Sequence, residues 1–348
     1  MRREPYKVAV VGLGKRGIVH LESYVKLKDD YSVVGVYNPT FAKTEQAAKQ
    51  YNLPNEVLFQ DPEEMMRQTK PDILSFVTNP GIRLEYVEMA ARHHVKGLIF
   101  EKPMANTIEE AKQILDICEA NHIKAIICHQ HKYLPLFKEM KAMVDGGELG
   151  RILRIEANCQ SWASQIATHY IDYMLWIGNN IVAKSVVGHT HGDRFMHSHH
   201  PSPEFIMGEI RFEKGVTGNI QCGYFTHTDK EHVVDYDKEI LPLDFWADCR
   251  LTVRGENGYI WAECDGHMGR CTPATNGKLV TKTVPGFWDI EDTLQIPYAE
   301  DFIKWMDDDT KVHPCNVQQG YRGFEILEGI YRSDREHRKV DLPILLDL

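Results

Sequence analysis

KVAVVGLGKRG, at residues 7–17, joins an apolar run to a glycine-rich turn. The run Lys7–Val11 reads as a strand that is apolar on both faces, and such a strand belongs in a sheet covered on both sides. The turn has the spacing Gly-x-Gly-x-x-Gly, and a helical stretch, Ile18–Lys28, follows it. A strand before the turn and a helix after it form the context of a dinucleotide-binding turn. The stretch therefore predicts a Rossmann fold, which is a doubly wound parallel sheet.

Each glycine of this turn has a separate role. Gly12 makes the tight turn, Gly14 lets the backbone approach a pyrophosphate, and Gly17 lets the helix pack on the strand. The phosphate then rests on the N-terminus of the helix. The cofactor-binding residues predicted here are Gly12, Leu13, Gly14, Lys15, Arg16 and Gly17, with the charges of Lys15 and Arg16 in reach of a phosphate.

The end of the second predicted strand, Tyr31–Tyr37, bears on the choice of cofactor. An acidic residue that binds the adenosine ribose is expected about 20 residues after the glycines, and the residue here is Asn38. Asparagine can hydrogen-bond a 2′-hydroxyl and does not repel a 2′-phosphate, and before Pro39 it is also a turn former. The sequence leaves both NAD and NADP open and favours NAD.

Polar residues follow two later strands of the predicted sheet, 72–77 and 97–100. Side chains at these strand ends face the cofactor crevice in a doubly wound sheet. The predicted cofactor-binding residues at the two ends are Thr78, Asn79, Pro80, Glu101 and Lys102.

Lys102 is also a candidate catalytic residue. A lysine is rarely buried without a partner. At a strand end, desolvation and a nearby positive charge, such as an oxidised nicotinamide, would lower its pKa and make it a proton acceptor. The alternative is a solvated lysine in a turn.

The two halves of the chain differ in pattern. Six strands alternate with helices up to Cys128, which predicts a Rossmann dinucleotide-binding domain over residues 1–128. Residues 129–348 are predicted to form an α+β domain for substrate binding and oligomerisation, built on a large, mostly antiparallel sheet. Its strands are expected at 152–157, 181–188, 205–212, 217–223, 250–254 and 258–263, and its last helices at 298–307 and 317–333.

The composition narrows the class of protein. Of the 348 residues, 43% are hydrophobic and 26% are charged, as in a globular protein with an ample core. The formal charge of -10 argues against nucleic acid as a partner, and no apolar run reaches the roughly 18 residues of a membrane span. The eight cysteines lack CxxC spacing and no signal peptide is evident, so we expect reduced thiols in a cytoplasmic protein.

Several motifs together resemble the Gfo/Idh/MocA family of nicotinamide-dependent sugar and cyclitol oxidoreductases. They stand in the order of the family and span nearly the whole chain. They are the glycine-rich turn, Glu101-Lys102-Pro103, GELGRI at 147–152, HYIDYMLW at 169–176, VQQGYRG at 317–323 and IYRS at 330–333. The ordered set is specific to the family and carries no information on the substrate.

The resemblance implies roles for several residues. Lys102 matches the catalytic lysine that relays the proton of the substrate hydroxyl, and His169 matches the histidine that bonds the reacting oxygen. It also implies a small carbohydrate-like substrate, no metal, and a homodimer or homotetramer formed through the open sheet of the second domain. Asp172 shares a helix face with His169. The predicted substrate-binding residues are His131, Tyr133, Trp162, Gln165 and Asp172.

The sequence departs from the family at two places. Many members have an aspartate four residues before the histidine, where this chain has Gln165, which cannot raise the pKa of an imidazole by charge. Lys132 stands where the family often has arginine, and lysine cannot form a bidentate fork.

A histidine-rich segment, His189–His200, allows three interpretations. Imidazoles beside Asp193 suit a transition metal, but their spacing matches no standard motif. The prolines and serines that follow favour a loop at the rim of a pocket. In the third interpretation His199, His200 and Tyr133 bond sugar hydroxyls.

Three functions follow from these patterns. The first is an NAD(P)-dependent oxidoreductase that interconverts a hydroxyl and a ketone on a sugar, glycoside or cyclitol. The second is a redox-neutral enzyme that cleaves or eliminates a glycosidic group with a retained cofactor. The third is a non-catalytic cofactor-binding regulator, against which the presence of both Lys102 and His169 argues.

Overall fold

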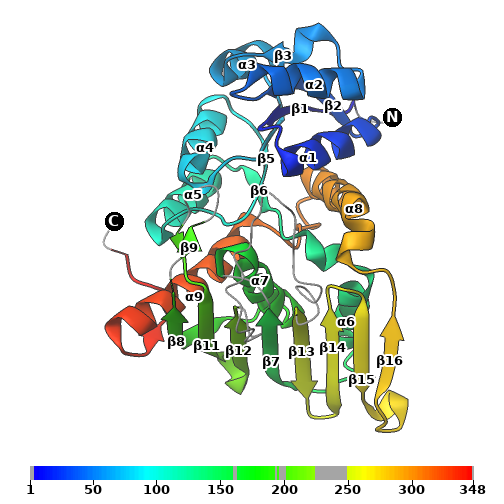
Figure 1. The fold of residues 1–348 in the computed structure, drawn as a ribbon, viewed down its shortest axis with the longest axis vertical. Helices are drawn as coiled ribbons and strands as arrows, with labels where there is room; N and C mark the ends of the chain where they lie inside the picture. The colour runs from blue at the N-terminus through cyan, green and yellow to red at the C-terminus, as the bar shows by residue number, and fades with distance from the viewer. Residues whose placement is uncertain (1–3, 160–162, 193, 196–200, 224–248, 347–348) are drawn as a thin grey trace, which may run out of the picture. The chain divides into compact units, whose positions relative to one another are not determined.

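The protein is represented by a computed structural model that describes residues 4–159, 163–192, 194–195, 201–223 and 249–346 (Figure 1). The chain divides into two compact units. The first consists of Met1–Gln130 and Glu291–Tyr321, and the second of His131–Ile290 and Arg322–Leu348. Trp162, Asp193, His197, His199 and His200, which the sequence singled out, lie outside the described residues.

The first unit contains a parallel six-stranded sheet with the order β3-β2-β1-β4-β5-β6. This order confirms the doubly wound fold. The strands follow one another in one direction from β1 to β3 and in the other from β4 to β6, and doubly wound sheets bind their ligands at this switch point between β1 and β4. The strands are β1 Tyr6–Val11, β2 Tyr31–Tyr37, β3 Leu58–Phe59, β4 Ile73–Phe76, β5 Gly97–Phe100 and β6 Lys124–Ile127.

Helices and short helical turns connect these strands. Side-chain caps start two of them: Asp61 accepts from the N–H of Glu64, and the hydroxyl of Thr107 accepts from the N–H of Glu110 at 3.2 Å. For the second of these helices the sequence allows a capping box of either Asn106 with Glu109 or Thr107 with Glu110, and the structure has the Thr107 cap. The helices are α1 Lys15–Lys26, α2 Phe41–Tyr51, α3 Pro62–Thr69, α4 Arg83–Arg92 and α5 Ile108–Ala120, with the turns η1 Asn55–Val57 and η2 Pro80–Ile82.

A late segment of the chain returns to the first unit. Helix α8 runs over Phe287–Asp307 and contains Pro297, whereas the sequence placed its start after that proline, at Tyr298. The hydroxyl of Tyr31 donates to the carbonyl of Ala299, and a Cβ added at Gly97 would lie 2.9 Å from the ring of Phe302. The predicted division gave residues 291–321 to the second domain, because helical periodicity alone does not identify the sheet that a helix covers.

The second unit contains a nine-stranded sheet with the order β16-β15-β14-β13-β7-β12-β11-β8-β17, in which only β7 and β12 pair in parallel among the described strands. This confirms a mostly antiparallel sheet. Its strands are β7 Ile152–Cys159, β8 Ala183–His191, β11 Phe205–Phe212, β12 Thr217–Cys222, β13 Arg250–Gly255, β14 Gly258–Glu263, β15 His267–Cys271, β16 Val280–Thr283 and β17 Val340–Asp341. A separate pair comprises β9 Arg194–Phe195 and β10 Pro201–Ser202.

Alternation along these strands gives the large sheet two different faces. The inner face is apolar and packs against helices; a Cβ added at Gly188 or Gly208 would lie 2.6 Å from the side chain of Ile330. The outer face carries charged side chains that form cross-strand pairs, such as Arg254 with Glu156 at 2.6 Å. The helices of this unit are α6 Pro135–Asp145, α7 Thr168–Ile177 and the greater part of α9 Val317–Glu336, with the turns η3 Gln130–Tyr133, η4 Ala163–Ala167, η5 Glu213–Gly215 and η7 Pro273–Thr275.

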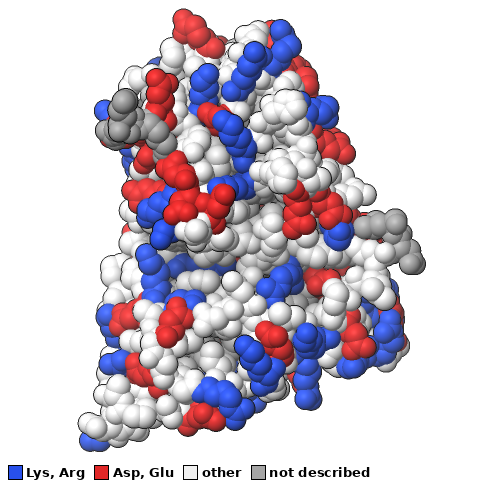
Figure 2. All heavy atoms as spheres, turned by 180° about the vertical axis from the view of Figure 1, so that it is seen from behind, with Lys and Arg blue, Asp and Glu red and all other residues white. Residues whose placement is uncertain are grey.

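The surface charges are mixed in sign. On the face shown in Figure 2, Lys and Arg side chains are interspersed with Asp and Glu, so no extended basic patch covers that view. Among the described residues, no helix combines the length and apolarity that crossing a membrane requires.

Candidate active site

The glycine-rich turn between β1 and α1 has one open position and two crowded ones. Gly12 has a φ of +84°, and a Cβ there would lie 2.2 Å from the carbonyl oxygen of Val77. A Cβ at Gly17 would lie 1.8 Å from the carbonyl oxygen of Gly12. A Cβ at Gly14 would meet nothing within 4 Å. The crowded glycines hold the turn against its neighbours, and the open one leaves room for a pyrophosphate at the start of α1. The turn therefore fits a dinucleotide.

Asn38, at the end of β2, supports this turn. Its Oδ1 accepts from the N–H of Leu13 at 2.9 Å, and its Nδ2 donates to the carbonyl of Thr40 at 3.2 Å. The amide thus fixes the backbone next to Gly12, a role that the sequence did not predict. A contact with the cofactor ribose stays a prediction.

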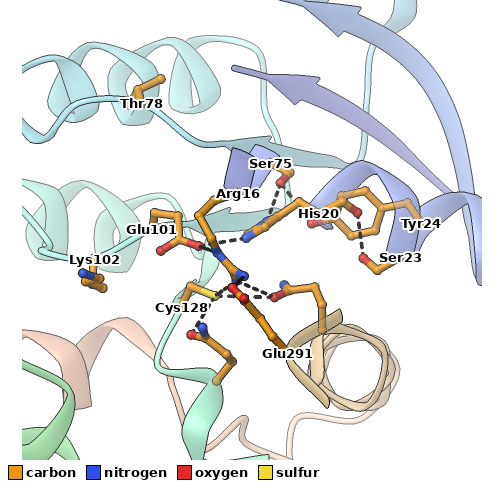
Figure 3. A network of polar contacts seen from close by, with 12 residues as sticks. Arg16, His20, Ser23, Tyr24, Ser75, Thr78, Glu101, Lys102, Cys128 and Glu291 are labelled. Carbon is orange, nitrogen blue, oxygen red and sulfur yellow. Dashed lines mark hydrogen bonds and ion pairs between the residues drawn. The ribbon is translucent and has the colours of Figure 1, made fainter. Parts of the chain in front are cut away.

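The guanidinium of Arg16 points toward carboxylates. Its Nε lies 3.0 Å from Glu101 Oε1, its Nη1 lies 3.1 Å from Glu291, and its Nη2 lies 3.3 Å from Gln295 (Figure 3). The sequence placed Arg16 in reach of a phosphate. In this structure it joins α1, the end of β5 and α8, because the buried Glu101 carboxylate attracts it. A contact with the cofactor phosphate stays a prediction.

Glu101 is the centre of a buried polar network that the sequence did not reveal. His20 Nε2 lies 3.2 Å from Glu101 Oε1, and the other ring nitrogen of His20 lies 3.3 Å from Ser75 Oγ. Burial alone would raise the pKa of Glu101, but the charge of Arg16, the hydrogen bond from His20 and the charge of Lys102 hold this pKa well below its usual range. Arg16 and His20 are four residues apart on α1, so they share one helix face.

This network includes three atoms of metal-ligand type. Atoms of His20, Glu101 and Cys128 lie within 4.8 Å of one another. Arg16 donates to Glu101 at 3.0 Å and to the sulfur of Cys128 at 3.7 Å, so its positive charge already meets two of them. Burial also raises the pKa of the Cys128 thiol, which keeps it protonated. The arrangement fits a charge network better than a cation site.

Lys102 follows Glu101 at the end of β5 and lies to one side of this network (Figure 3). Burial, together with the charges of Arg83 and Arg16, lowers the pKa of Lys102 to about 8 against the attraction of Glu101. An amine with this pKa can accept or release a proton near neutral pH. Thr78, Asn79 and Pro80 stand at the end of the neighbouring β4, so the predicted residues of the first unit gather at the carboxyl edge of one sheet.

In the second unit, His169 belongs to a group of stacked rings. His169 lies on α7, and its Nδ1 is 2.8 Å from the hydroxyl of Tyr173, one turn later. The ring of His131 stacks on His169 with 4.8 Å between centroids, and Phe287 packs on His131 at 4.3 Å. This packing fixes the orientation of the His169 imidazole. Tyr173 is a supporting residue that the sequence analysis missed, although its spacing from His169 signals a shared face.

Asp172 forms a buried ion pair that the sequence did not predict. Its Oδ2 lies 2.6 Å from Lys132 Nζ, and both side chains are almost completely buried. The carboxylate therefore neutralises Lys132 inside the unit. A contact of Asp172 with the substrate stays a prediction. Tyr133 is buried as well, with the Lys138 ammonium 5.7 Å from its ring centre. Gln165 lies in the π-helical turn η4.

Two family models match the chain. The model described as the oxidoreductase family with an NAD-binding Rossmann fold matches residues 6–129. The model of the GFO/IDH/MocA C-terminal domain matches residues 137–261. Together the matches cover well over half of the chain. They confirm the predicted family and agree with NAD as the cofactor of the first domain.

Individual relatives are more distant. A D-glucoside 3-dehydrogenase of Escherichia coli (strain K12) is 27% identical over 156 residues, which are 44% of this chain and 42% of that protein. The chain thus spans about half the length, or less, of the curated relatives it matches. A levoglucosan dehydrogenase, solved with NADH and levoglucosan, has a TM-score of 0.79 at 18% identity and covers 98% of this chain and 100% of that one. The transcriptional regulator Gal80p has a TM-score of 0.78 at 16% identity over 98% of this chain and 95% of its own. These structural likenesses show the fold.

Proposed function

Because the chain belongs to the Gfo/Idh/MocA oxidoreductase family, we propose that it is an NAD-dependent oxidoreductase that interconverts a hydroxyl and a ketone on a sugar, glycoside or cyclitol. The observation that carries this proposal is the placement of Lys102, half-buried at the carboxyl end of β5 with its main-chain carbonyl held by Arg83. Desolvation there brings the pKa of its amine to about 8. A binding protein has no use for an amine poised to exchange a proton near neutral pH. Relatives and structural neighbours named as dehydrogenases of glucosides and levoglucosan support the same class of substrate.

The proposed roles of the residues follow from their chemistry. NAD, when bound, supplies the acceptor or donor of the hydride. The open position at Gly14 receives the pyrophosphate, and Asn38 keeps the turn in shape. Lys102 Nζ takes the proton of the substrate hydroxyl during oxidation and returns it during reduction. His169, held by Tyr173 and His131, orients the reacting oxygen.

The test is to purify the protein without added cofactor, identify any nucleotide that denaturation releases by mass spectrometry, and assay a panel of sugars and cyclitols. We expect reduced nicotinamide to accumulate with NAD and at least one polyol. Released NAD together with product formation, but without net reduction, would favour the redox-neutral function, for which Gln165 leaves room. Nucleotide binding without turnover on any panel member would favour the regulatory function instead.

The pH dependence of the reaction follows from Lys102. Oxidation needs the neutral amine, so kcat/KM for oxidation should rise with pH and level off above about 8. Two pH units below this pKa, kcat/KM should be about 100-fold lower than on the plateau. Reduction needs the ammonium, so kcat/KM for reduction should fall with rising pH over the same range. Measuring both directions between pH 5 and 10 checks this prediction. A profile for oxidation that is flat across this range would contradict the role of Lys102.

We also propose that the outer face of the large sheet joins copies of the chain into a homodimer or homotetramer. Val187 and Met207 are each 42% exposed there on neighbouring strands, and the guanidinium of Arg250 stacks 4.1 Å from the ring centre of Trp261. Met207→Glu should give a smaller particle by light scattering after gel filtration. The variant should still show a cooperative thermal melt, which shows that it stays folded. Lys304→Glu, on an exposed side chain of α8 in the first unit, is the control. An unchanged mass for Met207→Glu would contradict this interface.

A further inference from the structure

Arg83 joins the ends of two central strands of the Rossmann sheet. It is the first residue of α4, and only 2% of its surface is exposed. Its Nη2 donates to the carbonyl of Thr78, after β4, at 2.8 Å and to the carbonyl of Lys102, after β5, at 3.2 Å. A single nitrogen thus holds the main chain of the proposed proton relay in register with the neighbouring strand end.

The charge of Arg83 is not neutralised by a partner of its own. Its Nε and Nη1 are buried and have no hydrogen-bond partner among the described residues. Glu101 attracts it, but the Glu101 carboxylate is already bonded to Arg16 and His20. Burial lowers the pKa of Arg83 to about 9, so the guanidinium is still charged at neutral pH. A buried cation with unsatisfied donors costs stability, so packing alone does not account for it.

We infer that Arg83 is a positioning residue: it anchors the main chain of Lys102 and presents an uncompensated positive charge to the Lys102 amine. This inference rests on the proposed function. Four charged or titratable residues of the first unit act on the Lys102 amine. They are Glu101 beside it, Arg83 on α4, Arg16 on α1 and Cys128 after β6. Arg16 is neutralised by Glu101 and Glu291, which leaves Arg83 as the cation without a paired carboxylate in this group.

Two substitutions separate the charge of Arg83 from its hydrogen bonds. Arg83→Gln keeps an N–H donor for the carbonyls and removes the charge. Arg83→Lys keeps the charge and loses the fork of donors. Arg322→Gln is the matched control, because Arg322 also donates to two carbonyls, those of Asn180 and Ile181, but in the second unit. Arg83→His, which is neutral above pH 7, replaces the Gln variant if that protein does not fold.

The readout is the titration of Lys102 itself. The full-length protein, without added NAD, is acetylated with a trace of acetic anhydride across a pH series, and mass spectrometry gives the rate at Lys102. The midpoint of wild type is expected near 8. Arg83→Gln should raise it by about one unit, whereas Arg83→Lys and Arg322→Gln should leave it unchanged. In the oxidation assay, the pH profile of kcat/KM should shift by the same amount.

The outcomes distinguish the inference from the proposed function. An unshifted midpoint in Arg83→Gln, or an equal shift in Arg83→Lys, overturns the role of Arg83 while the enzyme can still be active. A shifted midpoint in a protein that turns over no polyol supports the electrostatic effect of Arg83 and overturns the proposed reaction. The labelling needs no substrate, so it tests Arg83 in either case.

Discussion

Lys102→Met is expected to lower kcat for the oxidation of a polyol about 1,000-fold, within the range that general acid–base catalysis contributes. Methionine keeps an unbranched side chain of similar length but carries no proton, so the loss falls on the chemical step. The affinity for NAD should change little, because the glycine-rich turn and Asn38 are untouched. Steady-state kinetics with calorimetric titration of NAD measure both quantities.

Lys96→Met provides the matched control at the opposite end of β5. The Lys96 side chain is 67% exposed, and its Nζ lies 2.8 Å from Asp72, so its removal takes away only a surface ion pair. This variant should keep the kinetics of wild type. If Lys102→Met bound NAD and turned over as fast as Lys96→Met, Lys102 would not be the proton relay.

Alanine at Gly14 and at Gly17 should have opposite effects on stability and binding. At Gly17 the new Cβ would overlap the carbonyl oxygen of Gly12 at 1.8 Å, so the backbone must shift, and we expect a loss of about 3 kcal/mol or more in the free energy of unfolding. At Gly14 the Cβ meets nothing within 4 Å, so the melting temperature should hold. The methyl group would instead occupy the space for the pyrophosphate and weaken NAD binding about tenfold or more.

Thermal melts and NAD titration of the two alanine variants check this pair of expectations. Gly14→Ala serves as the control for Gly17→Ala in the melts, and wild type serves as the reference for NAD affinity. A Gly14→Ala protein with unchanged NAD affinity would show that the cofactor does not lie against this turn.

The sequence was most informative where chemistry is local. The glycine spacing at 12–17 specifies a turn that few other residues can form. At the start of α5, the Thr107 hydroxyl accepts from the N–H of Glu110, only three residues further on. The alternation of strands and helices then leaves few topologies, and the observed strand order is the common one for a doubly wound sheet. These features depend on neighbours along the chain, so the fold class was predictable.

The unpredicted features depend on residues that are distant in the sequence. Arg16 reaches Glu101 and Glu291, which lie 85 and 275 residues further on. Lys132 and Asp172 neutralise each other inside the second unit, and the sequence did not predict this pair. Burying one such charge without the other would be unfavourable, but only the tertiary fold shows which charges are partners. The same holds for Arg83, whose importance comes from the carbonyls and carboxylates around it.

The return of residues 291–321 to the first unit has a consequence for protein engineering. A recombinant fragment that ends at residue 130 would contain every strand of the Rossmann sheet and the whole glycine-rich turn. It would lack the Phe302 ring that packs on Gly97, the acceptor of the Tyr31 hydroxyl and the Glu291 carboxylate of Arg16. Such a fragment would expose apolar surface and aggregate. A portable nucleotide-binding module from this protein must therefore be assembled from two separate pieces of chain, joined by a linker that replaces the inserted second unit.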